Sequence, residues 1–175
     1  MKKLIALVLS LVLVLSLAAC GGKSAPSAKT VEGTMEELAN KIIESNPVEF
    51  MGGIIPVDLT DTSEDGLWAL TNYTGLKSAE KLTDIAVYEP MMGSMAFSMV
   101  LVRVADAKEA QNVAQEMTDN IDTRKWICVG ADEKLVAGYG DVVMLIMLDS
   151  QLGLTAQSFV DAFASVCGGE LDFTI

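Results

Sequence analysis

The segment that follows residue 33 carries apolar positions at helical spacing. Thr34 and Glu37 form a capping-box pattern, in which each side chain meets the backbone of the other, and Asn46-Pro47 stops the repeat. A helix is therefore predicted over residues 35–45.

A second helical pattern follows a connection at residues 48–59 that contains glycine and proline. Asp61 and Glu64 have the spacing of another capping box, and Gly75 is the residue type that ends many helices. The apolar positions between them are Leu67, Trp68, Leu70 and Tyr73. A short helix ending at Gly75 is predicted.

Residues 84–104 have the pattern of a β-hairpin. Two extended runs, 84–89 and 94–104, flank the turn Pro90-Met91-Met92-Gly93. In the second run, one face carries Met95, Phe97, Met99 and Leu101, and the other carries Ser94, Ala96, Ser98 and Val100. The face with the larger residues is expected to meet the core. Asp106 then caps a helix whose inward stripe is Ala110, Val113, Ala114 and Met117.

The same order of elements follows again. An extended run 134–138, a tight turn 139–141, an apolar run 142–148 and a helix 155–166 are predicted, and the helix turns Phe159, Val160, Phe163 and Val166 toward the sheet. The predicted fold is α+β. One two-layer domain over residues 34–175 contains an antiparallel sheet of about four strands, built from two β-β-α units and packed by helices.

Residues 1–19 have the three parts of an export signal. Lys2-Lys3 forms a basic start, residues 4–17 form an apolar run interrupted only by serines, and Ala18-Ala19 leads to Cys20. As a helix the apolar run spans about 21 Å, less than the ~30 Å hydrocarbon layer. A cleaved signal helix is therefore predicted rather than a transmembrane anchor.

The segment Leu17-Ala18-Ala19-Cys20-Gly21 resembles the lipobox of bacterial lipoproteins. The resemblance implies that the Cys20 thiol is joined to a diacylglycerol, with palmitate-type acyl chains, and that cleavage occurs just ahead of it. Two acyl chains bury on the order of 30 methylenes at ~0.8 kcal/mol each, which makes attachment effectively permanent. Residues 20–33 are expected to be the lipidated cysteine and a flexible linker with a reach of about 20 Å.

Charge limits the partners of the mature chain. Lys2 and Lys3 are the only charges before Cys20, so the remaining residues carry 24 acidic and ten basic side chains and a net charge of −14. Such a surface repels phosphate groups, which excludes nucleic acid and any electrostatic membrane attachment. Solubility explains this acidity, with a cation-binding role as the alternative.

The chain contains no histidine, which removes the commonest general base and zinc ligand. No catalytic, cofactor or metal motif is recognisable, although a serine-lysine pair or two carboxylates across a cleft remain compatible with the composition. Four methionines, Met91, Met92, Met95 and Met99, could serve as soft copper(I) ligands, but strand alternation favours core packing. Cys128, expected in a strand, and Cys167, at a helix end, are compatible with either a disulfide or two buried free thiols.

Several segments together resemble an uncharacterised family of Gram-positive bacterial lipoproteins, a domain of unknown function. They are the lipobox, TMEELANKII, YTGL, DIAVYEP, VRVADAKEAQNVAQEM and AGYGDVVMLIML. The resemblance implies a small α+β domain displayed outside the cell, with no assigned activity.

The predicted function is a non-catalytic surface binding module, lipid-anchored on the extracytoplasmic face of the cell membrane. Its expected partner is an envelope protein, peptide or polymer. The alternatives are a small-ligand binding or sensing lipoprotein and, third, a carboxylate-based envelope hydrolase.

Overall fold

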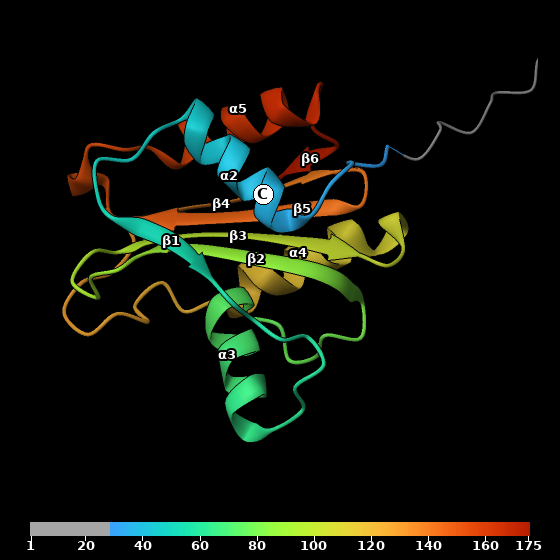
Figure 1. Cartoon of the computed structure of the whole chain (residues 1–175), viewed down its shortest axis with the longest axis horizontal. Helices are drawn as coiled ribbons and strands as arrows, with labels where there is room; N and C mark the ends of the chain where they lie inside the picture. The colour runs from blue at the N-terminus through green and yellow to red at the C-terminus, as the bar shows by residue number, and fades with distance from the viewer. Residues whose placement is uncertain (1–28) are drawn as a thin grey trace, which may run out of the picture.

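The structure, a computed structural model, describes residues 29–175 (Figure 1). Its elements in chain order are α2 (Met35–Ser45), β1 (Gly52–Ile55), α3 (Glu64–Thr74), β2 (Leu82–Pro90), β3 (Phe97–Val104), α4 (Ala110–Asn120), β4 (Glu133–Tyr139), β5 (Val142–Leu148), α5 (Ala156–Cys167) and β6 (Phe173–Thr174), with 3₁₀ turns at Ala107–Glu109 and Ser150–Leu152. The predicted signal peptide, Cys20 and most of the predicted linker lie outside the described residues. Within residues 29–175, no helix is both long enough and apolar enough to cross a membrane.

All the strands belong to one antiparallel sheet with the order β1-β2-β3-β5-β4-β6. The chain is therefore an α+β protein, as predicted, but the sheet has six strands rather than about four. The additional strands are the edge strands β1 and β6, of four and two residues. They are too short to show an alternating pattern. They form because the free edges of β2 and β4 provide backbone hydrogen-bond partners.

Helices cover both faces of the sheet (Figure 1). On one face, α2 and α5 enclose a core that includes Phe97 and Phe159; on the other, α3 and α4 enclose a core that includes Val100 and Leu145. The predicted two-layer arrangement is wrong, because the fold has three layers. Both faces of β3 and β5 are apolar, and all seven residues of β5 are buried, so each face requires a cover.

The connections explain why α4 and α5 lie on opposite faces. The units β3-α4-β4 and β5-α5-β6 each join two parallel strands with one strand between them, and both move toward the β6 edge. Because β3 and β5 are antiparallel, two crossovers of the same hand in the same direction must place their helices on opposite faces. The two predicted β-β-α units are thus present in chain order, but no two-fold rotation relates them.

Local signals at the helix ends are largely confirmed. Thr34 caps α2 in a reciprocal capping box with Glu37, and Gly75 ends α3 in the left-handed conformation at φ 77°. The N-cap of α3 is Ser63 instead of the predicted Asp61. The Asp61 carboxylate accepts a hydrogen bond from the Ser63 backbone at 2.9 Å, and this turn brings Ser63 to the cap position.

The predicted hairpins are present with small shifts in their bounds. β3 begins at Phe97 rather than Ser94, because the Met95 N–H donates to the Met92 carbonyl and keeps these residues in the turn. The predicted alternation is confirmed within β3, where Phe97 and Met99 face the α2 and α5 core.

Candidate functional site

The two ends of the sheet differ in what they carry. At the end that we call the loop end, β2 finishes and β3 begins, and four connections lie there: residues 46–51, 91–96, 121–132 and 149–155 (Figure 1). The opposite end, called the Lys29 end, carries the β4–β5 turn and the first described residues.

At the Lys29 end, the chain is fastened to the sheet before α2 begins. The Lys29 Nζ donates to the Asp172 carboxylate at 2.7 Å, and the Arg103 guanidinium donates to the Gly33 carbonyl at 2.8 Å. Gly140, in the β4–β5 turn, has φ 59°, and a Cβ there would collide with the Lys29 carbonyl oxygen. The chain from the predicted linker therefore meets the domain at this end.

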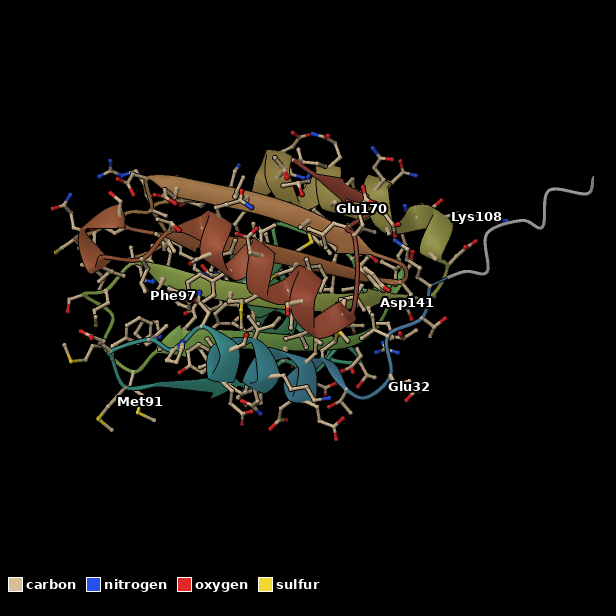
Figure 2. All side chains as sticks on the ribbon, turned by 90° about the horizontal axis from the view of Figure 1, so that it is seen from above. Glu32, Met91, Phe97, Lys108, Asp141 and Glu170 are labelled. Carbon is tan, nitrogen blue, oxygen red and sulfur yellow. The ribbon has the colours of Figure 1, made fainter. Side chains whose placement is uncertain are left out.

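Large apolar side chains project from the connections at the loop end. The exposed fractions are 78% for Met51, 74% for Met91, 60% for Met92 and 95% for Ile127, and we call these four residues the apolar rim. The Met91 N–H donates to the Met51 carbonyl at 2.9 Å, which brings two of the connections together. Figure 2 shows Met91 at the opposite end of the molecule from Asp141.

Exposed apolar side chains mark a surface whose burial against another molecule is energetically favourable. Removing apolar surface from water contributes about 25 cal/mol per Å², and soluble domains seldom leave such side chains grouped without a role in binding. Three rim members are methionines, whose flexible thioether side chains adapt to partners of different shape. The other exposed large apolar residues between 29 and 175, Leu67 and Trp68, lie on α3, which extends away from the sheet (Figure 1).

The connection 121–132 is fastened to the sheet by a buried lysine. The Lys125 side chain is 4% exposed, and its Nζ forms an ion pair with Glu89 of β2 at 2.5 Å. It also donates to the Ser98 hydroxyl of β3 at 3.2 Å and lies 4.7 Å from the ring centroid of Tyr73 on α3. We call the group Lys125, Glu89 and Ser98 the lysine latch, because it joins a connection without regular structure to two strands.

Burial and ion pairing act in opposite directions on the latch. Desolvation lowers the pKa of Lys125 below its ordinary value, whereas the charge and hydrogen bond of Glu89 favour the ammonium form. A buried charge that loses its partner is strongly destabilising, so the pair fixes the connection. Trp126 packs against the α3 and α4 core, and the next two residues, Ile127 and Cys128, face solvent.

The contact between Ser98 and Lys125 is not arranged as a catalytic dyad. Ser98 is fully buried, so its hydroxyl cannot reach a substrate. The Lys125 amine is ion-paired with Glu89 and lacks the free lone pair that a general base requires. The serine-lysine pair that composition left open is therefore a structural contact here.

A cavity of about 350 Å³ lies beside the N-terminal end of α3. Its walls mix polar and apolar groups, including Asp58, Asp61, Leu70, Lys77, Glu80 and Leu82. The backbone and hydroxyl of Thr60 donate to Asp58, and the backbone of Ser63 donates to Asp61. These hydrogen bonds lower the pKa of both carboxyl groups.

Cys128 and Cys167 are free thiols in the structure, so the bridge that the sequence left open is not formed. Cys128 lies in the exposed connection, and the prediction that it sits in a strand is wrong, because this segment has no ladder partner. Cys167 packs against the α2 and α5 core, whereas the neighbours of Cys128 pack on the other face. Burial raises the pKa of Cys167 to about 12.

The four methionines considered as copper ligands lie in different environments, and Met95 is partly buried. Met99 is fully buried in the core, while Met91 and Met92 are exposed in the turn. Within residues 29–175, no group of three or more histidine, cysteine, aspartate or glutamate side chains is placed to hold a metal ion.

Sequence reasoning did not single out the latch residues or Ile127. The available signal was the short apolar run Trp126-Ile127-Cys128, but the same run led to the prediction of a strand at Cys128 and so did not indicate exposure.

Comparisons with protein-family models, curated proteins and solved structures find no match for this chain. The resemblance to Gram-positive lipoproteins therefore stays a prediction, and the functional argument rests on geometry and charge.

Replacing Lys125→Met should lower the free energy of unfolding by about 3 kcal/mol, because Glu89 would be left buried without its partner. Urea unfolding of the full chain measures the change. The double variant Lys125→Met/Glu89→Leu should recover part of the loss. As a control, Lys81→Met breaks the exposed 2.7 Å pair with Glu109 and should have little effect. Equal losses for the two lysine variants would contradict the latch.

Iodoacetamide at mildly alkaline pH should modify Cys128 rapidly and leave Cys167 unmodified. The thiolate is the reactive form, and a pKa of about 12 leaves almost none of it at Cys167. Peptide mass spectrometry locates the label, and Cys128→Ser should remove the fast reaction. Both thiols should react after unfolding in urea. If neither reacted until a reductant was added, the two cysteines would be bridged and the free-thiol arrangement would be wrong.

Proposed function

We propose that this protein is a lipoprotein anchored through Cys20 on the extracytoplasmic face of the cell membrane, and that it is a non-catalytic binding module whose contact surface is the apolar rim. The observation that carries the proposal is the position of the rim. Met51, Met91, Met92 and Ile127 lie at the loop end, opposite the Lys29 end where the chain from Cys20 joins the domain.

This arrangement suits a domain that is held at one end and binds at the other. β2 contains nine residues, so the sheet is about 30 Å long at 3.3 Å per residue. A flexible linker that joins the domain at the Lys29 end would hold that end within about 20 Å of the membrane and leave the rim, at the other end of the sheet, free to reach farther into the envelope. Exposed apolar side chains at the Lys29 end would instead lie close to the bilayer.

A carboxylate hydrolase is less well supported by the cavity beside α3. A glycosidase needs one carboxylic acid whose pKa is raised so that it can protonate the leaving group. In this cavity, hydrogen bonds from Thr60 and Ser63 lower the pKa of Asp58 and Asp61 instead.

Small-ligand binding is the second candidate, and the observation in its favour is the size of the same cavity. About 350 Å³ is at the lower end of the range for ligand sites. Its mixed walls include Lys77 beside several carboxylates, so a ligand would have to satisfy both signs of charge in a small space. Binding to the apolar rim requires no such match of charges in a confined space, so we favour the rim over the cavity as the binding surface.

An alkyne-tagged palmitate fed to expressing cells should label the wild-type protein and leave Cys20→Ser unlabelled, because only a thiol can form the thioether. The serine variant should also accumulate at the mass of the uncleaved precursor. Gel fluorescence and intact mass measure the two effects. Cys128→Ser serves as the matched control and should be labelled like the wild type. Equal labelling of the Cys20→Ser protein would remove the anchor from the proposal.

A photoreactive p-benzoylphenylalanine in place of Ile127 or Met91 should form discrete adducts when intact cells are irradiated. The same group in place of Trp68, which is 64% exposed on α3, should form few, because that side chain lies away from the rim. Immunoblotting compares adduct yields at equal protein levels. The rim is not the contact surface if the Trp68 position yields as many adducts as the other two, or if none of the positions yields any.

A further inference from the structure

Carboxylates surround the apolar rim. The four connections at the loop end contain Glu49, Asp122, Asp132 and Asp149, against two cations, Arg124 and Lys125. The charge of Lys125 is already neutralised by its ion pair with Glu89. The loop end is therefore acidic as well as apolar.

Glu49, Asp132 and Asp149 form no ion pair in the described part of the chain, whereas Asp122 lies close enough to Lys125 for its charge to favour the ammonium form. Asp122 accepts from the Arg124 backbone, Asp132 accepts from the backbone and hydroxyl of Ser150, and Asp149 accepts from a backbone N–H. None of these bonds neutralises a charge.

The Lys29 end holds most of the ion pairs of the described residues. Three ion pairs lie there, Lys29–Asp172, Lys81–Glu109 and Arg103–Asp141, with N–O distances of 2.7, 2.7 and 3.6 Å. The Lys29 end also carries carboxylates outside these pairs, such as Glu32 and Glu36, so acidity alone does not distinguish the two ends. The loop end differs because its carboxylates accompany the exposed apolar rim.

We infer that the apolar rim and its carboxylates bind a cationic amphipathic segment of a partner protein. Apolar side chains of such a segment would cover the methionines and Ile127, and its lysines or arginines would meet Glu49, Asp122, Asp132 and Asp149. This inference rests on the proposed function and adds the chemistry of the partner to it.

Two other occupants of the rim are disfavoured by charge. A second copy of the chain would bring one acidic rim against another, and a net charge of −14 beyond Cys20 adds to the repulsion. An anionic lipid surface would meet the same repulsion. A cationic segment is the occupant for which the apolar and electrostatic contributions have the same sign.

The test uses the full lipidated chain in nanodiscs of neutral phosphatidylcholine and a fluorescent peptide probe of about 18 residues, long enough for an amphipathic helix. Three probes are compared: leucine with lysine, leucine with glutamate, and serine with lysine. The leucine-lysine probe should bind about tenfold more tightly than either of the others, as measured by anisotropy. Raising salt from about 0.05 to about 0.5 M should weaken it several-fold.

Matched double variants separate the two contributions. Met91→Ser/Ile127→Ser should weaken leucine-lysine binding by about tenfold. The control Leu67→Ser/Trp68→Ser removes two exposed apolar side chains from α3, away from the rim, and should not weaken it.

For charge, Glu49→Gln/Asp122→Asn should weaken binding by about threefold. The control Glu32→Gln/Glu36→Gln removes two charges near the Lys29 end and should have no such effect.

The inference is overturned if the leucine-glutamate probe binds as tightly as the leucine-lysine probe, or if the control variants weaken binding as much as the rim variants. Should photo-adducts at Ile127 persist in cells while the cationic probe shows no preference, the rim would remain a contact surface and only the cationic partner would be wrong. Absence of those adducts would instead remove the proposed function.

Discussion

The apolar character of both faces of β3 and β5 is the constraint on which the rest of the structure depends. Every residue of β5 is buried, and in β3 only Arg103 is partly exposed. An antiparallel sheet often leaves one face to water, but that arrangement here would expose either Phe97 and its neighbours or Val100 and Leu145. Helices must therefore cover both faces. Once they do, the sheet itself can contact other molecules only along its edges and at its two ends, and any other contact must use the outer surfaces of the helices.

The two ends are used differently. At the Lys29 end, polar side chains bind the chain that leads into α2, whereas the loop end holds exposed methionines and Ile127. The lysine latch explains how an irregular connection can present an apolar side chain in a fixed position. A buried ion pair contributes little net stability compared with well-packed apolar residues, so its value lies in geometry. By holding the residues just before Ile127, it reduces the ordering cost that binding would otherwise incur.

Much of the fold was predictable because its signals are local. The capping box at Thr34 and the turn at Gly140 lie within a few residues of what they control, and both are confirmed. The number of layers was not predictable in the same way. Alternation in β3 separates large from small residues, which favours one buried face, yet Val100 and Val102 on the other face are also apolar and need a cover. The latch joins positions 89, 98 and 125, and no local pattern encodes contacts at such separations.

Charge gives the exposed rim its selectivity. The proposed lipid anchor would concentrate copies of this chain in two dimensions, where apolar surfaces on neighbouring copies tend to bury each other. Around this rim, Glu49, Asp122 and their neighbours would meet their own copies within the screening length of about 8 Å. That repulsion opposes self-association but adds to the attraction for a partner of opposite charge. The acidity that composition alone assigns to solubility thus has a second consequence at the loop end, where it decides which molecules can cover the methionines.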